Sequence, residues 1–449
     1  MEPRQLSTMA SRFQAVLDAE VLNERGRQLN LVKRERLVTP FRLSLSVMAS
    51  MATQQVATIA DLHRQFNELW DLQIDYKAFY NQLLKESSPD FFRTSLSDIM
   101  GQLSMKVLGF EAGQAFGEFN RLILHDGSSF ALHKALSHVF PGRFTTVSPA
   151  AVELHCTLDL LQDAPIVITL SPDTDSEHAY RPAPESLCGN LLLVDRGYLD
   201  LTYFRDIDRQ GGFFIARSKS HLNPRVLDAY REDGQRLKSC QERDFQAIIS
   251  KLPKQQRAEL AVQWLIEGEP FRLRLIVQWN SETKCFESLL TNLPQDRYAL
   301  HMICLGHRLR WQVELLFKEW KSHTNLHKFD TEKDTISEAL IWASLAASAL
   351  KRFLAHAAER LLEVVISTRK AAMPSAYELP QLFRALRHGD GPGYRHAFEA
   401  MLRYLGRNAK RAHPKRDART GRSRLGLKPI FQLSESSMLI DNLEEPIAA

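Results

Sequence analysis

The chain has few cysteines, and none of them are arranged in motifs. Its 449 residues include five cysteines, at Cys156, Cys188, Cys240, Cys285 and Cys304, and no two of them form a CxxC pair. The odd number and the wide spacing argue against a disulfide framework and against a cysteine-based zinc site. This usage fits a protein of a reducing cytosol.

Long apolar segments are also absent. The N-terminus carries Glu2, Arg4 and Arg12 without an apolar run, so we expect no signal peptide. The most apolar stretch, Ala339 to Leu350, is too short and too rich in alanine and serine to span a bilayer. We expect it to be a buried helix, and we expect no membrane partner. No internal repeat is visible.

The overall composition is that of an ordinary globular protein. Hydrophobic residues make up 44% of the chain and charged residues 25%. The length predicts two or three domains. A net charge of +5 permits a nucleic-acid partner but does not require one, because clustering of charge matters more than its sum.

The first 115 residues show helical patterns. Thr58 is a candidate cap for a helix over residues 58–66, and a short connection leads to a second helix over residues 74–84. This resembles a helix-turn-helix, whose second helix would carry Tyr76 and Lys77 into a DNA major groove. A plain helical hairpin explains the same pattern equally well.

Strand patterns begin near residue 121. Candidate strands rich in β-branched and aliphatic residues cover 121–125, 152–160, 166–170, 190–194 and 211–217. The apolar run 190–194 suits a central strand that is buried on both faces. Further strand candidates at 244–249, 271–279 and 285–292 predict an inserted antiparallel β subdomain, and helical patterns return from about residue 297.

These patterns predict five regions along the chain. They are a helical N-terminal DNA-binding domain (1–115), a first core segment (116–217), the β subdomain (218–295), a second core segment (296–372) and a helical C-terminal region with a basic tail (373–449).

Three acidic residues stand at positions that could form one site. Asp126 and Asp195 each follow an apolar strand candidate, and each has a glycine within two residues. Glu314 lies in a predicted helix over residues 307–321, on a polar stripe with Arg310, Lys318 and Lys321. Taken singly, each aspartate could simply form a turn, and the polar stripe of the helix could simply be a solvated face. Together, three carboxylates suit Mg²⁺ or Mn²⁺, and two such ions can promote phosphodiester cleavage.

The same helix has an apolar stripe opposite its charges. Leu309, Val313, Leu316, Phe317 and Trp320 recur at steps of three and four residues, which predicts one buried face.

The segments around these acids resemble the acidic blocks of DDE transposases, most closely the IS-four family of bacterial insertion sequences. The blocks are Leu124 to Ser128, Leu193 to Tyr198 and His307 to Lys321. The resemblance covers roughly residues 118 to 370.

The third block carries the most specific part of the resemblance. The family's signature is Y-x2-R-x3-E-x6-K, and Arg310, Glu314 and Lys321 match it at the right spacing. His307 stands where the family has tyrosine. A histidine at that position can still stack on DNA or donate to a phosphate.

The resemblance implies a fold class. It is α/β, with a ribonuclease-H-like mixed sheet flanked by helices, an inserted antiparallel β subdomain and an all-helical N-terminal domain. The first aspartate would lie on the first strand, the second after the fourth, and the glutamate on a helix after the insertion.

The resemblance also implies an activity. Asp126, Asp195 and Glu314 would be the catalytic residues and the ligands of two Mg²⁺ or Mn²⁺ ions. Water would nick the element end, and the resulting 3′-hydroxyl would form a hairpin on the opposite strand before joining to target DNA. No covalent enzyme intermediate and no ATP are implied. The expected partners are double-stranded DNA, at terminal inverted repeats and target, and a second copy of the chain, in a bacterial cytoplasm at the nucleoid.

Several residues are expected to contact DNA under this resemblance. Arg310, Lys318 and Lys321 would hold phosphates beside the metal ions. Family members hold a flipped base on a tryptophan of the insertion, for which Trp279 is the first candidate and Trp264 the second. Either tryptophan could instead pack within the β subdomain.

The segment from Arg403 to Lys428 is densely basic. It includes Lys410, Arg411, Lys415, Arg416 and Arg419, and its glycines and proline predict a flexible tail. Binding to phosphates is the sharper interpretation of this tail, and a solubilising role is the alternative.

The sequence is also compatible with two other functions. One is a metal-dependent DNA nuclease without transposition, and the other is a domesticated DNA-binding protein with a decayed site. The presence of all three carboxylates argues against decay.

Overall fold

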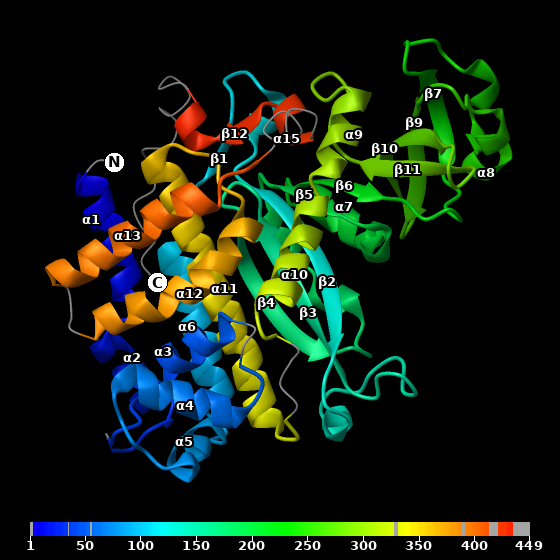
Figure 1. Cartoon of the computed structure of the whole chain (residues 1–449). Coiled ribbons are helices and arrows are strands. Elements are labelled where there is room, and N and C mark those ends of the chain that lie inside the picture. Colours follow the sequence, from blue (N-terminus) through cyan, green and yellow to red (C-terminus); the bar gives the residue numbers. More distant parts are fainter. Residues whose placement is uncertain are drawn as a thin grey trace.

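The chain folds into a mixed α/β structure in which helices lie on both sides of a large sheet (Figure 1). It is a computed structural model that describes residues 3–34, 36–53, 56–326, 331–387, 391–412 and 421–433. Within these ranges, no helix has the length and hydropathy needed to cross a membrane.

The elements of this structure have the following bounds. The helices are α1 (Pro3–Ala15), α2 (Ala19–Gln28), α3 (Pro40–Met51), α4 (Ile59–Trp70), α5 (Tyr76–Leu83), α6 (Ser88–Leu103), α7 (Leu201–Arg209), α8 (Phe245–Ile248), α9 (Leu300–Arg308), α10 (Trp311–His323), α11 (Asp334–Leu362), α12 (Thr368–Leu386), α13 (Pro392–Asn408) and α15 (Gly421–Arg424). The strands are β1 (Leu108–Phe110), β2 (Leu122–Ala131), β3 (Ala151–Asp159), β4 (Ala164–Pro172), β5 (Leu191–Val194), β6 (Phe213–Arg217), β7 (Arg225–Arg231), β8 (Arg243–Asp244), β9 (Ala258–Ile266), β10 (Glu269–Asn280), β11 (Cys285–Thr291) and β12 (Leu427–Pro429).

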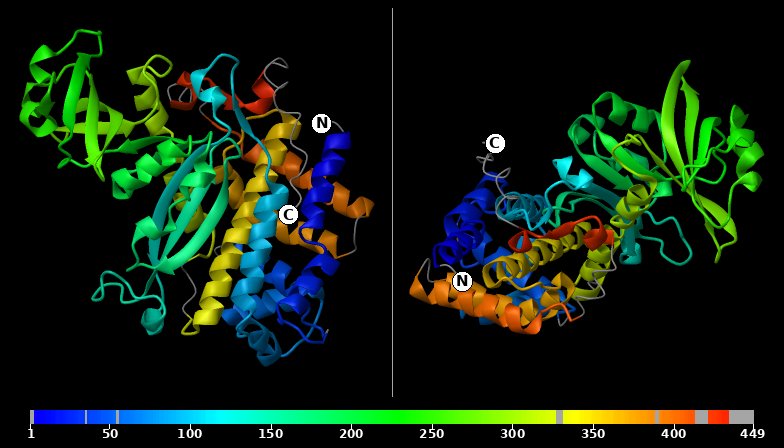
Figure 2. Two further views of the ribbon diagram at one scale, coloured as in Figure 1. Left: turned by 180° about the vertical axis from the view of Figure 1, so that it is seen from behind. Right: turned by 90° about the horizontal axis from the view of Figure 1, so that it is seen from above.

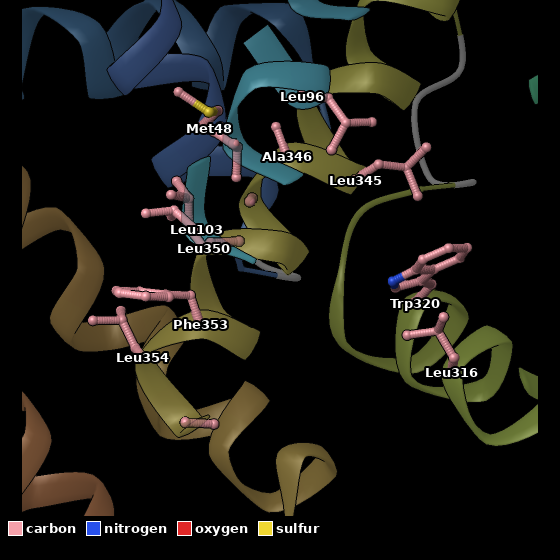
Figure 3. Packing of buried hydrophobic residues seen from close by; sticks show 14 of the residues in the cluster. Met48, Leu96, Leu103, Leu316, Trp320, Leu345, Ala346, Leu350, Phe353 and Leu354 are labelled. Carbon is pink, nitrogen blue, oxygen red and sulfur yellow. The ribbon is translucent and has the colours of Figure 1, made fainter. Parts of the chain in front are cut away.

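The helices from both ends of the chain form one bundle around α11. Figure 2 shows α11 between the sheet and the N-terminal helices. Leu96 and Leu103 of α6 and Met48 of α3 pack on α11, while Leu316 and Trp320 of α10 lie on the sheet side (Figure 3). The prediction that residues 339–350 form a buried helix is confirmed.

The predicted cap at Thr58 is also confirmed. Its side chain accepts a hydrogen bond from Asp61 N at 3.1 Å, and the Asp61 carboxylate accepts one from Thr58 N at 3.0 Å. This reciprocal capping box fixes the start of α4. Tyr76 and Lys77 are exposed on α5, and their contact with DNA stays a prediction.

In the part of the chain that the structure describes, the sheet has ten strands in the order β4-β3-β2-β5-β6-β11-β10-β9-β7-β8. The first three strands are antiparallel, and β2, β5 and β6 are parallel to one another. This is the ribonuclease-H-like arrangement, so the predicted fold class is confirmed. The central strand β5 is buried on both faces, as its continuous apolar run predicts.

Two strand predictions are wrong in detail. The first strand does not end at His125, because pairing with β3 continues to Ala131 opposite Ala151. Asp126 therefore lies inside β2 rather than after its end. Most of residues 244–249 form the short helix α8. Phe245 and Ile248 are three residues apart, so a helix places both side chains on the same buried side.

The inserted strands do not form a separate sheet. They are antiparallel, as expected, but β11 pairs with β6 through Leu289 opposite Arg217 and Thr291 opposite Ile215. The insertion thus extends the core sheet (Figure 2). The predicted domain boundaries stay predictions.

The basic segment near the C-terminus is more ordered than predicted where the structure describes it. Residues up to Asn408 belong to α13, and β12 pairs with β1 more than 300 positions earlier in the chain. Arg422 Nη2 donates to Gln312 Oε1 at 2.6 Å, which ties the segment to α10. Lys415, Arg416 and Arg419 lie outside the described residues.

Lys351 is a buried cation that joins three helices of the bundle. Its Nζ donates to Ala52 O at 3.0 Å, just after α3, and to His323 O at 2.8 Å, at the end of α10. Burial lowers the pKa of Lys351 to about 8.

We expect this lysine to make stability depend on pH. Its folded pKa is lower than its unfolded one, so the unfolded chain binds more protons between about pH 8 and 10.5. The difference between the unfolding free energies of the wild type and of Lys351→Met, measured by urea denaturation, should therefore rise as pH increases across that interval. A difference that does not change with pH would contradict the burial of this charge.

Candidate active site

Asp126 and Asp195 lie at the same level of two neighbouring parallel strands. Leu124 of β2 is opposite Leu193 of β5, and each aspartate is two residues further along its chain. Adjacent strands are about 4.8 Å apart, and residues two apart share a face. Both aspartates therefore lie on the sheet face that α10 covers, where Val313 and Leu316 pack.

Glu314 reaches this position from the first turn of α10. Arg310 lies between two carboxylates: its Nη1 donates to Asp126 Oδ2 at 3.2 Å and its Nη2 to Glu314 Oε1 at 2.5 Å. The arginine thus brings together the acids of a strand and a helix that are 188 positions apart in the sequence. The predicted apolar stripe of this helix is buried, as expected.

The helix that carries Glu314 is shorter than predicted. Residues 307–321 are divided between α9, which ends at Arg308, and α10, which begins at Trp311. Leu309 N bonds to Gly306 O and Arg310 N to His307 O, so a tight i to i+3 turn interrupts the helix. This turn places Arg310 directly before the first turn of α10.

The three carboxylates influence one another electrostatically. Burial raises the pKa of Asp126 to about 6, and the negative charges of Glu314 and Asp195 act in the same direction. Arg310 and the N–H of Gly127, which donates to Asp126 Oδ1 at 3.0 Å, oppose that rise. A nearby cation would therefore stabilise the charged form of Asp126.

Buried polar atoms at the site that have no hydrogen-bond partner in the described part of the chain include Asp195 Oδ1, His307 Nε2 and Arg310 Nε. Burial lowers the pKa of His307 to about 4, with Arg310 adding to the effect, so this imidazole is neutral at pH 7. A buried carboxylate oxygen such as Asp195 Oδ1 has the chemistry to coordinate a cation.

The donor set fits a divalent ion, although the described residues contain no ready metal site. No three His, Cys, Asp or Glu side chains among them are grouped closely enough to hold a metal. The guanidinium of Arg310 lies between Asp126 and Glu314 and donates to both. Carboxylate oxygens are the ligands that Mg²⁺ and Mn²⁺ prefer, and Asp195 Oδ1 is unpaired. Metal binding by the three acids stays a prediction.

The other predicted residues of the acidic helix have different surroundings. Lys321 Nζ donates to Ser129 O of β2 at 2.8 Å, and burial lowers the pKa of Lys321. Lys318 is exposed, and its Nζ lies 4.5 Å from the ring centre of Trp311. Both flank the carboxylates, but their contact with phosphates stays a prediction.

The remaining predicted DNA contacts are on other elements. Trp279 is half-buried on β10, with Lys254 Nζ 4.2 Å from its ring centre and Phe286 against it. Trp264 is half-buried on β9. Strands β6 and β11 separate these tryptophans from β5, so the structure does not join them to the acids. Tyr76 and Lys77 are on α5, Lys410 and Arg411 follow α13, and Arg411 lines a cavity beside α10.

Glu153 is an acid near the site that sequence reasoning missed. It is buried on β3, and its Oε2 accepts a hydrogen bond from Arg143 Nη2 at 3.0 Å. Burial, with Glu177 adding to it, raises the pKa of Glu153 to about 7. A Cβ at Gly127 would be 2.6 Å from Glu153 Oε1, so the glycine after Asp126 leaves room for this carboxyl.

A signal for this layer was present in the sequence. Strand β3 alternates polar with apolar residues, and its polar set is Glu153, His155, Thr157 and Asp159. Such alternation places all four on the sheet face opposite Asp126.

Curated relatives of this chain are transposases of insertion sequences. The chain is 22% identical over 377 residues to the transposase for IS231C of Bacillus thuringiensis subsp. berliner, covering 74% of this chain and 76% of the relative. It is 22% identical to the transposase for IS1151 of Clostridium perfringens, covering 56% and 57%. A short region is 40% identical to the putative transposase InsL for IS186A of Escherichia coli K12, covering 14% and 17%.

A solved structure and a family model were also matched. The piggyBac transposase in a synaptic complex with hairpin DNA aligns with 92% of this chain and 89% of its own at 11% identity and a TM-score of 0.45. The model described as "Transposase DDE domain" matches residues 117–350, which is more than half of the chain and includes Asp126, Asp195 and Glu314. The chain therefore belongs to the family of transposases with a DDE domain.

Proposed function

We propose that this transposase carries out cut-and-paste transposition of an insertion sequence, with Asp126, Asp195 and Glu314 as its catalytic residues. It would cleave phosphodiester bonds at the element ends and join the 3′-ends to target DNA. The observation that supports this most is the placement of the acids on neighbouring elements. Two aspartates lie level on parallel strands, and Arg310 links Glu314 to one of them.

The three carboxylates would hold the divalent ions. Bound ions supply an activated water and stabilise the leaving oxygen in phosphodiester cleavage. Asp126 and Glu314 would exchange Arg310 for that positive charge. The freed guanidinium would remain beside the carboxylates, where a DNA phosphate is a suitable bidentate partner. Lys318 and Lys321 follow Glu314 along α10 and would hold neighbouring phosphates.

The proposed partners follow from this chemistry. The substrate would be double-stranded DNA with terminal inverted repeats, and two copies of the chain would pair the two ends. The relatives' names, as transposases of insertion sequence elements, support this substrate. Chromosomal targets would bring the protein to the nucleoid.

Two assays on one preparation test the proposal. Nicking of a plasmid that carries element ends, with and without Mg²⁺, tests cleavage. Joining of labelled 3′-ends to a target plasmid tests transposition. Nicking without joining would leave a metal-dependent nuclease, and neither activity would leave a DNA-binding protein.

The cleavage rate is expected to depend on the protonation of Asp126. Its pKa of about 6 means that the carboxylate is lost as pH falls through that value, and a metal ligand must be deprotonated. The rate of nicking at limiting Mg²⁺ should therefore fall about tenfold per unit below pH 6. Saturating Mn²⁺ should move this fall to lower pH, and a rate that stays constant down to pH 5 would exclude Asp126 as a ligand.

A further inference from the structure

A cavity of about 370 Å³ lies on the side of α10 that faces away from Glu314. Gln312, Leu316 and Glu319 of α10 form one wall, at helical steps of four and three. The other walls come from the junction of α11 with α12 and from the C-terminal segment with α15 and β12.

The cavity is lined by more positive than negative charge. Its six cationic side chains are Lys318, Arg352, Arg369, Arg411, Arg422 and Lys428. Its three carboxylates are Asp163, Glu319 and Glu359.

The carboxylates are already paired inside the protein. Arg352 donates to Glu319 Oε2 at 3.0 Å and forms an ion pair with Asp163 at 2.8 Å. Glu359 accepts a hydrogen bond from Ile366 N at 3.1 Å. Two of the cations are paired as well, since Lys428 forms an ion pair with Glu111 and Arg422 lies 3.7 Å from Asp163. The lining cations for which the described residues supply no ion pair include Lys318 and Arg369.

Buried donors in the cavity wall lack acceptors among the residues that the structure describes. Arg422 Nε and His356 Nε2 are buried there without a hydrogen bond. His356 is 6% exposed, and its Nε2 is 3.6 Å from Asp163 Oδ2, which is too long for a hydrogen bond. Arg422 Nε is a donor in every protonation state of the site, so a ligand atom that accepts hydrogen bonds could satisfy it.

The N-terminus of α12 adds to this preference for anions. Val365, Ser367, Thr368 and Arg369 line the cavity at the start of this 19-residue helix. First-turn N–H groups lack intrahelical partners, and the helix dipole is positive there. Arg369 is exposed and has no ion pair within the described ranges.

Apolar groups complete the walls. Leu108, Leu315, Ile366 and Pro429 line the cavity between the cations. Apolar side chains beside cationic ones suit a nucleotide, because the base has a planar face that packs on apolar groups and the phosphate is anionic.

We propose that this cavity binds one phosphate-bearing nucleotide of a DNA strand that crosses α10 from the carboxylate side. The proposal deepens the proposed function and rests on it. The crossing is short, because a helix is only about 10 Å wide. Lys318 lines the cavity one helical turn after Glu314 on α10 and would hold a phosphate on the way. The strand is thereby held on both sides of the helix that carries Glu314.

Binding of single-stranded DNA, measured without divalent ions, tests this proposal. The probe is a fluorescein-labelled 20-mer, followed by anisotropy over a range of salt concentrations. Arg369→Gln removes a rim cation, and Ser423→Glu adds a carboxylate at an exposed position of the wall. The matched control is Arg387→Gln, an exposed arginine at the other end of the same helix, about 27 Å away.

We expect the two cavity variants to weaken binding about fivefold to tenfold and to reduce the salt slope by about 0.7, as for one lost phosphate contact. Arg387→Gln should bind like the wild type. Equal affinities and slopes for all four proteins, each shown to be folded by circular dichroism, would overturn the proposal.

Two further arms separate the possible failures. Inorganic phosphate is titrated by thermal shift, and a phosphate effect that Arg369→Gln abolishes without changing DNA affinity would assign the cavity to free phosphate and overturn the DNA proposal. Nicking is measured in parallel. If the cavity variants bind DNA as tightly as the wild type and the wild type nicks DNA, only the cavity proposal is refuted. If the cavity variants bind DNA more weakly but the wild type does not nick DNA, only the proposed function is refuted.

Discussion

Replacing Glu314 by glutamine is expected to lower DNA nicking by at least about a thousandfold while DNA affinity changes by less than about twofold. Glutamine has the same shape and can still accept the hydrogen bond from Arg310 Nη2, so the fold of this region should persist. The change removes the negative charge that would hold a divalent ion. The measurement is the initial rate of nicking of a plasmid with element ends, in Mg²⁺.

A control with the same local chemistry is available on α13. Glu399 and Arg403 form an exposed ion pair four residues apart, at 2.6 Å, like the pair of Glu314 and Arg310. Glu399→Gln should leave nicking unchanged. If Glu314→Gln nicked at a comparable rate, the glutamate would have no part in the chemistry.

Replacing Asp126 by asparagine is expected to stabilise the metal-free protein at pH 7.5 by about 1 to 3 kcal/mol. The folded pKa of about 6 is above the ordinary value of 3.8, so the charged carboxylate is penalised in the folded state at neutral pH. Its side chain is 19% exposed, so solvent screens this penalty only in part. The same substitution should remove any stabilisation by Mn²⁺.

The stability difference between Asp126→Asn and the wild type should depend on pH. The penalty is present above about pH 6 and vanishes below about pH 4, where the carboxyl is protonated in both states. The advantage of Asp126→Asn in urea denaturation should therefore shrink as pH falls from 7.5 to 4. Asp228→Asn serves as the control of opposite sign, because hydrogen bonds from Arg236 lower the pKa of Asp228 to about 2. An Asp126→Asn protein that is less stable at pH 7.5 would contradict the account.

The core of the fold was predictable because its signals are local. The apolar run before Asp195 is long enough to define a buried central strand, and the spacing of Arg310, Glu314 and Lys321 marks one face of a helix. Strands β3 to β6 and the cap at Thr58 follow from the same kind of pattern.

The errors arose where distant parts of the chain decide the local structure. Residues after Asp126 resemble a turn, but pairing with β3 keeps them in a strand. The insertion joins the core sheet through β6 and β11, and β12 pairs with β1 across more than 300 residues. No local pattern indicates such partners.

The arrangement within the candidate site was only partly predictable. The three acids were identified from their motifs, but the position of Arg310 between Asp126 and Glu314 depends on a contact between residues 184 positions apart. Glu153 was missed although the alternation along its strand signals a polar layer. That layer explains why the residue after Asp126 is a glycine.

The most direct test of the central claim is a count of bound Mn²⁺ by electron paramagnetic resonance, with DNA present. The account predicts about two ions per chain for the wild type, and loss of at least one of them in each of Asp126→Asn, Asp195→Asn and Glu314→Gln, with Glu399→Gln unchanged. Equal Mn²⁺ binding by the wild type and the three variants would show that these carboxylates do not form a shared metal site, and the proposed mechanism would be wrong.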